Sequence, residues 1–330
     1  MNPTSRRDFL KTAPWLPLGA AALGLGTVSA PALEPVRRTG GPALKISCNL
    51  FCFNQLLLDH LADPAKGIGL LELLDFCAKQ NFDGVDVTGY YFPGYQPDGL
   101  GVPTDKFIYD LKRRAFDLGL GISGTGVGNT FTTADAAARA RDVQRVKNWV
   151  EVAAKLGAPV IRVFADTQNG SKVWQTAAKG APRDQVEAWM AAAFRECADH
   201  AAKFGVIIGV QNHGDFIKTA ADQISLLKRI NSPWCGAIVD TGKFVAADPY
   251  AEITKAAPYA VNWQVKQSPL GPEAEKTAPT DLKRLLQIVR ASGYRGYLPI
   301  ETLHAGRAPY DPFDVVPKFL VELRAALAAG

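Results

Sequence analysis

The chain has 330 residues, of which 47% are hydrophobic and 21% are charged, so it is long enough to bury a large apolar core. Its formal net charge is +5, and basic and acidic residues are interspersed, with no basic run longer than the three residues Lys112, Arg113 and Arg114. This distribution argues against nucleic acids and anionic membranes as partners.

The first 32 residues have the pattern of an export signal. Residues 5–11 read "SRRDFLK", with the twin-arginine pair Arg6 and Arg7, and a weakly apolar stretch and a small-residue cleavage site follow. We expect cleavage before Leu33, export of the folded chain by the twin-arginine (Tat) machinery, and a periplasmic location. An uncleaved membrane anchor is the alternative, which the Gly and Pro content of the stretch disfavours.

The chain contains five cysteines, an odd number for an exported protein. Cys48 and Cys52 fall on one predicted strand, which would hold their Cα atoms roughly 13 Å apart. Because a disulfide requires less than about 7 Å between Cα atoms, we expect these two not to pair. We interpret all five as buried free thiols.

Short apolar runs rich in Val and Ile alternate with longer amphipathic segments along the rest of the chain. Eight such units in series predict a (β/α)8 TIM barrel, an α/β fold, over residues 44–330, preceded by a linker at 33–43. A doubly wound sheet is the alternative, which the even recurrence of the units disfavours. The segment 167–184, after the fourth run, is predicted to be a rim loop or lid. The predicted strands are residues 44–53, 84–89, 121–128, 158–166, 205–213, 235–242, 260–267 and 296–303.

Polar residues gather at the ends of these strands, where the active site of such a barrel lies. Residues two apart on a strand share a face, so Gln211 lies on the side of His213 and Gln264 on the side of Lys266. Taken singly, each residue has an ordinary explanation as a turn residue, a helix cap or a surface ion pair. Repetition of the pattern on four consecutive strands favours a site. The strand-end residues are Asp86, Thr88, Arg162, Asp166, Gln211, Asn212, His213, Asp240, Lys243, Gln264, Lys266, Gln267, Glu301 and His304.

The last four strand ends read "QNHG", "DTGK", "QVKQ" and "IETL". They resemble the xylose isomerase-like TIM-barrel family of sugar isomerases and epimerases, in which these ends often read E-N-H-G, D-T-G-H, H-x-K-D and a final Glu. The resemblance covers residues 44–327 and implies one ligand to a divalent metal from each strand. The matched ligand positions are Gln211, Asp240, Gln264 and Glu301.

Two of the four ligand positions depart from the family pattern. Gln264 replaces a His, as in hydroxypyruvate isomerase-like relatives, and Gln211 replaces a Glu that relatives use as an acid or base. Two carboxylates and two amide oxygens still provide a set of oxygen ligands that suits the hard cations Mn²⁺, Mg²⁺ and Ca²⁺. The lack of nitrogen and sulfur ligands disfavours Zn²⁺. We expect the metal to be held more weakly than by the usual ligands.

The resemblance implies proton abstraction next to a sugar carbonyl, through an enediolate that the metal stabilises. Glu301 is the expected base, and His213 or Lys266 would supply the second proton transfer. The expected partner is a small sugar or glycoside, and the sequence leaves a homo-oligomer open. The expected substrate contacts are Arg162, Lys243, Asp86, Asn212 and His304.

Two other functions remain open. Relatives of this barrel include lyases that act on 3-keto-glycosides, and the loss of one carboxylate and the expected export both favour such one-sided proton chemistry. A carbohydrate-binding barrel without activity would also explain the two Gln substitutions, although the retention of Asp240, Lys266 and Glu301 argues against it.

Two further functions are rejected. An endonuclease on this barrel would need a histidine-rich metal cluster, which four histidines do not build. The stretch "GTGVGN" at residues 124–129 lacks the spacing of a dinucleotide fingerprint, so NAD is not expected. We interpret its glycines as the rim of a sugar pocket.

Overall fold

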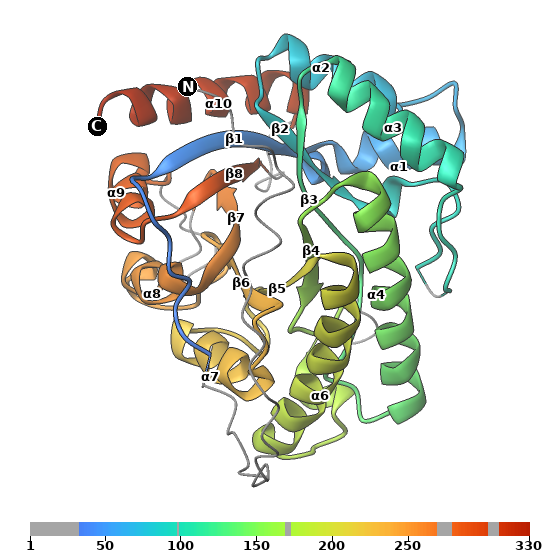
Figure 1. The fold of residues 1–330 in the computed structure, drawn as a ribbon, viewed down its shortest axis with the longest axis vertical. Helices are drawn as coiled ribbons and strands as arrows, with labels where there is room; N and C mark the ends of the chain where they lie inside the picture. Colours follow the sequence, from blue (N-terminus) through green and yellow to red (C-terminus); the bar gives the residue numbers. More distant parts are fainter. Residues whose placement is uncertain (1–32, 98, 169–172, 269–278, 303–309) are drawn as a thin grey trace, which may run out of the picture. The chain divides into compact units, whose positions relative to one another are not determined.

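The computed structural model describes residues 33–97, 99–168, 173–268, 279–302 and 310–330. Eight parallel strands close into a barrel in which each strand pairs with the next and β8 pairs with β1 (Figure 1). The predicted (β/α)8 TIM barrel is therefore confirmed. The strands are β1 Ala43–Asn49, β2 Gly84–Thr88, β3 Gly121–Gly126, β4 Val160–Phe164, β5 Ile207–Gln211, β6 Cys235–Asp240, β7 Ala260–Lys266 and β8 Arg295–Glu301.

Helices follow the strands along the chain and cover the outside of the barrel (Figure 1). Strands β2 and β6 are buried at every residue, as expected of parallel strands with helices on one face and a filled interior on the other. The helices are α1 Asn54–Ala62, α2 Leu70–Lys79, α3 Asp105–Asp117, α4 Ala136–Leu156, α5 Trp174–Ala177, α6 Arg183–Ala201, α7 Ala220–Ile230, α8 Pro249–Ala256, α9 Leu282–Ala291 and α10 Pro312–Ala328, with short 3-10 turns η1 Leu50–Phe53, η2 Gly89–Tyr91, η3 Ala202–Phe204 and η4 Ala257–Tyr259.

Capping residues in the sequence set where several helices begin and end. Asp135, Thr219 and Asp248 each accept a hydrogen bond from a backbone N–H in the first turn of α4, α7 and α8. Helix α4 ends at Gly157, whose φ of 84° is a left-handed conformation that glycine adopts without steric cost. The chain thus leaves each of these helices at a defined point.

The structure corrects the first predicted strand. β1 ends at Asn49, whose side chain accepts a hydrogen bond from the Phe51 N–H and begins the turn η1. Cys48 and Cys52 therefore do not lie on one extended strand. The Cys48 thiol donates to the carbonyl of Asn49, and the Cys52 thiol donates to the carbonyl of Ile300. All five cysteines are buried and free, as predicted, but the strand geometry used to exclude a bond between these two is wrong.

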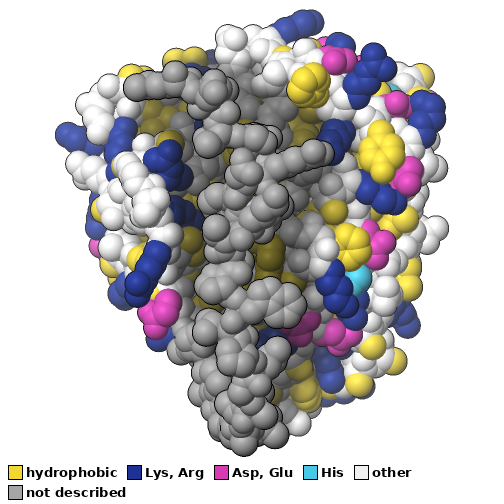
Figure 2. Space-filling model, viewed as in Figure 1, with side chains coloured by type: hydrophobic (Ala, Val, Ile, Leu, Met, Phe, Trp, Pro, Cys, Tyr) yellow, Lys and Arg dark blue, Asp and Glu magenta, His cyan; other side chains and the backbone are white. Residues whose placement is uncertain are grey.

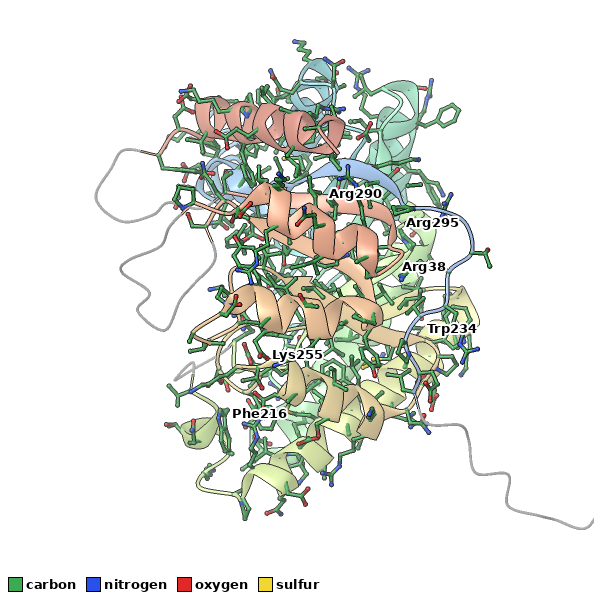
Figure 3. The ribbon with its side chains drawn as sticks, turned by 90° about the vertical axis from the view of Figure 1, so that its left-hand side faces the viewer. Arg38, Phe216, Trp234, Lys255, Arg290 and Arg295 are labelled. Carbon is green, nitrogen blue, oxygen red and sulfur yellow. The ribbon has the colours of Figure 1, made fainter. Side chains whose placement is uncertain are left out.

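The segment 33–42, predicted to be a linker, lies against the barrel. The Arg38 guanidinium donates a hydrogen bond to the carbonyl of Ala260, at the start of β7, over 2.6 Å. Arg295, at the start of β8, donates to the carbonyl of Gly41 (Figure 3). These contacts lie at the amino ends of the strands, away from the strand-end polar residues. The segment is therefore attached to the folded barrel.

Charged side chains of both signs are interspersed on the face shown in Figure 2. Within the described part of the chain, no helix combines the length and the apolar character needed to cross a membrane. The expected export signal at residues 1–32 lies outside the described residues.

Candidate active site

Five polar side chains meet at the carboxyl ends of β5 to β8. Strand register explains their meeting, because Asp240 pairs with Gln264 between β6 and β7, and Lys266 pairs with Glu301 between β7 and β8. Paired residues of adjacent parallel strands point to the same face of the sheet. Each of the five is buried. We refer to Gln211, Asp240, Gln264, Lys266 and Glu301 as the β5–β8 cluster.

Hydrogen bonds and an ion pair connect the whole cluster. The Gln211 Nε2 donates to Asp240 Oδ2 over 2.7 Å and to Gln264 Oε1 over 2.6 Å. Because β5 and β7 are not neighbours, the second bond crosses the barrel interior. The Lys266 ammonium donates to Glu301 Oε1 and lies 3.5 Å from Asp240 Oδ2. Gln211 Oε1 is buried with no hydrogen-bond partner among the described residues.

The charges of the cluster depend on one another. Burial alone would lower the pKa of Lys266, but the carboxylates of Asp240 and Glu301 outweigh burial and raise it. Lys266 is therefore an ammonium at neutral pH. Burial raises the pKa of Asp240, Lys266 opposes that rise, and the negative charge of Glu301 adds to it. Two acids thus share one buried cation.

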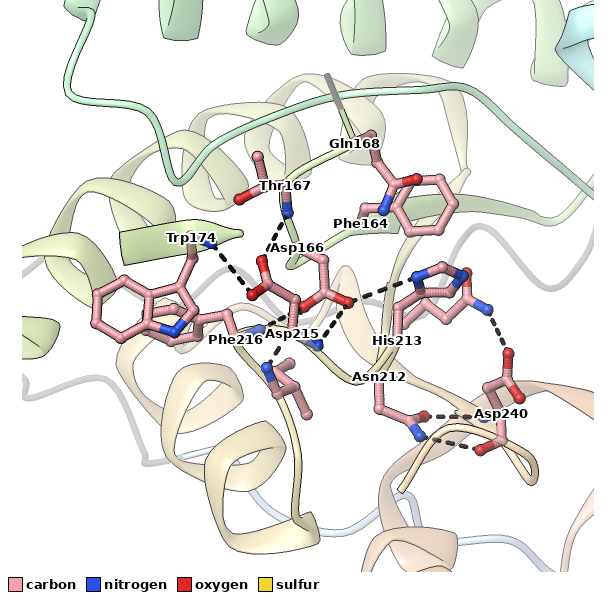
Figure 4. A network of polar contacts seen from close by, with 12 residues as sticks. Phe164, Asp166, Thr167, Gln168, Trp174, Asn212, His213, Asp215, Phe216 and Asp240 are labelled. Carbon is pink, nitrogen blue, oxygen red and sulfur yellow. Dashed lines mark hydrogen bonds and ion pairs between the residues drawn. The ribbon is translucent and has the colours of Figure 1, made fainter. Parts of the chain in front are cut away.

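The backbone of Asp240 is held by a neighbouring side chain. The Asn212 Nδ2 donates to the Asp240 carbonyl, and the Asn212 Oδ1 accepts from the Asp240 N–H, each over 2.9 Å (Figure 4). Asn212 is 0% exposed, so both of its polar groups are committed to the backbone of β6. The sequence predicted that Asn212 contacts the substrate. The structure instead makes it a positioning residue for Asp240.

A second polar group lies on β2 and β4. The Arg162 guanidinium lies 4.3 Å from the centre of the Phe164 ring and donates to the Tyr90 hydroxyl over 3.2 Å. Burial raises the pKa of Asp86 to about 6, the charge of Arg162 lowers it, and the charge of Glu301 raises it. The charges of Glu301 and Arg162 both shift the pKa of Asp86. Asp86 and Arg162 therefore lie within electrostatic range of the β5–β8 cluster.

The glycines of "GTGVGN" provide space for these charged side chains. A Cβ added to Gly124 would lie 2.5 Å from Asp86 Oδ2, and one added to Gly126 would lie 2.7 Å from Arg162 Nε. Neither glycine has a positive φ, so the requirement is for space rather than for backbone conformation. This agrees with the interpretation of the stretch as a pocket lining.

His213 lies with Asp166 and Phe164 beside the cluster (Figure 4). Its Nδ1 is 3.6 Å from Asp166 Oδ2, and its ring packs edge-on against Phe164 with 5.0 Å between ring centres. Burial raises the pKa of Asp166 to about 7, although a hydrogen bond from the Phe216 N–H opposes the rise. A carboxyl group whose pKa is raised to about 7 can exchange a proton with an imidazole that it contacts. The side chain of His213 is 32% exposed, so solvent reaches it.

The remaining predicted contacts have different outcomes. Lys243 is half-buried, and its charge lowers the pKa of Asp240, so it lies within electrostatic range of the cluster. His304 lies outside the described residues. The predicted rim segment 167–184 is described except for residues 169–172, and it includes the short helix α5 and the start of α6. The backbone N–H groups of Thr167 and Trp174 both donate to the Asp215 carboxylate (Figure 4).

Sequence reasoning missed two supporting residues. Asp215 accepts hydrogen bonds from two backbone N–H groups of the rim segment, those of Thr167 and Trp174. Asn129 accepts from the N–H of Phe164 and donates to its carbonyl, as Asn212 does for Asp240. The sequence contains a signal for Asn129, because an Asn follows the strand end both after β3, at "GVGN", and after β5, at "VQN". A side chain that pairs with the backbone of the next strand leaves no other mark in the sequence.

The predicted ligands converge, but they do not fit a divalent cation as they stand. Gln264 Oε1 and Asp240 Oδ2 both face the amide N–H groups of Gln211, and Glu301 Oε1 faces the Lys266 ammonium. No group of three His, Cys, Asp or Glu side chains that could hold a metal occurs in the described ranges. Mn²⁺ or Mg²⁺ would require the amide to turn and the ammonium to leave.

Comparisons with known proteins agree with the fold. The model of the "Xylose isomerase-like TIM barrel" family matches residues 74–320. D-psicose 3-epimerase from Clostridium cellulolyticum H10 is 16% identical with a TM-score of 0.67, over 86% of this chain and 99% of that one. An L-ribulose 3-epimerase is 18% identical with a TM-score of 0.65, over 87% and 96%. The 3-keto-D-glucoside 4-epimerase of E. coli is 17% identical with a TM-score of 0.62, over 78% and 94%.

At these identities the structural matches show a shared fold only. A search of curated proteins found no match. The family model, in contrast, spans most of the chain and includes β2 to β8, with the ends of β5 to β8 that carry the cluster. The chain therefore belongs to the xylose isomerase-like TIM barrel family.

Proposed function

We propose that this protein is a sugar isomerase or epimerase that moves a proton on a carbon next to a carbonyl group. The observation that carries the proposal is the buried pair of Glu301 and Lys266 at the ends of β7 and β8, with Asp240 beside it. A carboxylate base held against an ammonium combines the two elements that enolisation needs, a proton acceptor and a positive charge for the developing oxyanion.

The steps follow from the positions of these groups. Glu301 accepts the proton from the carbon next to the carbonyl, and the C–H electron pair forms the double bond of an enediolate. The Lys266 ammonium stabilises the negative oxygen. Return of a proton to the opposite face of the same carbon gives an epimer. Return to the neighbouring carbon, with the hydroxyl proton passing to the former carbonyl oxygen, gives an isomer. We assign this return to Asp86, because burial raises its pKa to about 6.

His213 and Asp166 supply a route for protons to solvent. The pair lies beside the cluster, His213 is partly exposed, and burial raises the pKa of Asp166 to about 7. Arg162 and Lys243 would bind substrate oxygens, as the sequence predicted. The expected Mn²⁺ or Mg²⁺ stays a prediction, and no step here passes through it, because the donor oxygens of Asp240, Gln264 and Glu301 already face N–H groups.

A 3-keto-glycoside lyase is the second candidate, and one observation favours it. Gln211, at the position of a family acid or base, is an amide tied to Asp240 and Gln264, so it transfers no proton. Elimination needs a base on one side only: Glu301 would take the proton at C2, and the C1–O bond would break to release the aglycone. The resemblance in fold to a 3-keto-D-glucoside 4-epimerase is compatible with a keto-glycoside substrate.

A product screen separates these functions. The purified protein and its Glu301→Gln variant are incubated with ketoses, aldoses and 3-keto-glucosides, and the products are analysed by NMR. A new sugar formed only by the wild type supports the isomerase or epimerase, and a free aglycone supports the lyase. Binding of sugars without turnover, equal in both proteins, would leave the non-catalytic carbohydrate-binding barrel.

We also propose that residues 1–32 direct export through the Tat machinery and that the barrel domain includes the attached segment from residue 33 onward. The twin-arginine pattern at Arg6 and Arg7 supports this proposal. Cell fractionation of the wild type and of the Arg6→Lys/Arg7→Lys variant tests it. We expect the wild type in the periplasm and the variant in the cytoplasm, and an equal distribution of both would contradict the proposal.

A further inference from the structure

The β5–β8 cluster contains its own cation, which lies between two of its carboxylates. The Lys266 ammonium contacts Glu301 Oε1 and lies 3.5 Å from Asp240 Oδ2, on the two strands that flank its own. Its side chain is 7% exposed, and those of Asp240 and Glu301 are 0% and 6% exposed. Buried carboxylates require a counter-charge, and Lys266 provides it from within the chain.

The Gln211 amide completes this arrangement. Its Nε2 points at Asp240 Oδ2 and Gln264 Oε1, while its Oε1 is buried with no hydrogen-bond partner among the described residues. The reverse orientation would bring its Oε1 against the Asp240 carboxylate, which is only an acceptor, and a nearby cation would then have to offset the repulsion. The amide thus takes the orientation that suits oxygens already neutralised by a lysine.

The chain also fixes the lysine in place. The Lys266 N–H donates to the Thr241 hydroxyl over 2.9 Å, and the Thr280 hydroxyl donates to the Lys266 carbonyl over 2.7 Å. A Cβ added to Gly242 would lie 2.5 Å from Lys266 Cγ and 2.9 Å from its Cβ. The stem of the lysine therefore packs on Gly242, and the absence of a side chain there makes its position possible.

We propose that Lys266 is the resident cation of this site, held among Gln211, Asp240, Gln264 and Glu301 in place of a divalent metal ion. Substitution of Lys266 by an uncharged residue would then open a divalent metal site on the same oxygens. The metal-binding part of this inference stands without the proposed function. A second part rests on it: the wild type would enolise its sugar with the ammonium as the positive charge.

Manganese binding to the full chain tests the first part. The wild type, Lys266→Met and Lys243→Met are treated with a chelator, dialysed and titrated with Mn²⁺, with free Mn²⁺ followed by electron paramagnetic resonance. Lys243→Met is the matched control, because it removes the same charge near Asp240 without emptying the space between Asp240 and Glu301. We expect about one Mn²⁺ on Lys266→Met, at least about tenfold tighter than on the wild type or the control.

Three outcomes would overturn the inference. The wild type could bind one Mn²⁺ as tightly as Lys266→Met does, the control could gain as much affinity as Lys266→Met, or a folded Lys266→Met could bind none. Lys266→Gln serves in the same titration where Lys266→Met does not fold, and the wild-type titration needs no variant. Since no measurement here involves sugar turnover, an inactive wild type that binds no Mn²⁺ would contradict the proposed function and leave this inference standing.

Discussion

Replacing Gln211 by Glu restores the carboxylate of the family pattern, yet the structure predicts that it destabilises this protein. Two hydrogen bonds from Nε2, of 2.7 and 2.6 Å, would become contacts between oxygens. Loss of the bonds costs about 1 to 3 kcal/mol each. A second carboxylate roughly 3 Å from Asp240 adds about 5 kcal/mol of repulsion at an effective dielectric constant near 20, and Lys266 offsets part of it. We expect about 3 to 5 kcal/mol less stability at pH 8.

Urea denaturation of the wild type and Gln211→Glu between pH 4 and pH 8 measures this effect. The pKa of the new carboxyl group is raised in the folded state, so the part of the deficit that comes from charge is absent near pH 4 and grows as the pH rises to the folded pKa. The part that comes from lost hydrogen bonds does not depend on pH. Gln211→Met is the control, because it loses the hydrogen bonds without gaining a charge, and its deficit does not depend on pH. Equal stability of Gln211→Glu and wild type at pH 8, without added metal, would show that the Gln211 amide does not stabilise Asp240 and Gln264 in the folded protein.

Three further predictions follow from the supporting residues. Asn212→Ala removes two hydrogen bonds to the backbone of Asp240, so we expect about 2 to 3 kcal/mol less stability in urea denaturation. Asn212→Asp, which keeps one acceptor, is the comparison. Unchanged stability of Asn212→Ala would contradict the role of Asn212 in holding the backbone of Asp240. Burial raises the folded pKa of Asp166 to about 7, so its contribution to stability falls as the pH rises from about 4 to 7, and Asp166→Asn should remove that slope. Gly124→Ala places a Cβ 2.5 Å from Asp86 Oδ2, so we expect it to abolish sugar binding measured by calorimetry. The circular dichroism spectrum should remain that of a folded barrel. Normal sugar binding would show that Asp86 has no part in the site.

The sequence predicts the barrel because its strands and helices repeat a local signal eight times. Each strand run is short and apolar, and capping residues such as Asp135 mark where helices begin. The boundary of β1 was missed since the apolar run continues past it, and only the Asn49 side chain, bonded to the Phe51 N–H, turns the chain. The attachment of segment 33–42 was missed for a similar reason, because it depends on contacts made by Arg38 with a strand far away in sequence.

The site was predicted as a set of strand ends but not as a network. Alternation along β7 places Gln264 and Lys266 on one face, and this was readable from the sequence. The pairing of Lys266 with Glu301 depends on register between strands, which no local pattern specifies. A lysine near two acids can contact a substrate, move a proton or neutralise the acids. Only the positions of Asp240 and Glu301 on either side of it favour the last of these.

The central claim is that the Glu301–Lys266 pair moves a proton on carbon, and deuterium uptake from heavy water tests it most directly. The purified protein is incubated in D₂O with ketoses and 3-keto-glucosides, and the substrate C–H signals are followed by proton NMR beside Glu301→Gln. We predict that, for at least one of these sugars, the hydrogen on the carbon next to the carbonyl is replaced by deuterium in the presence of the wild type and not in the presence of the variant. Exchange at the same rate with both proteins, or with neither although the sugar binds, would contradict it.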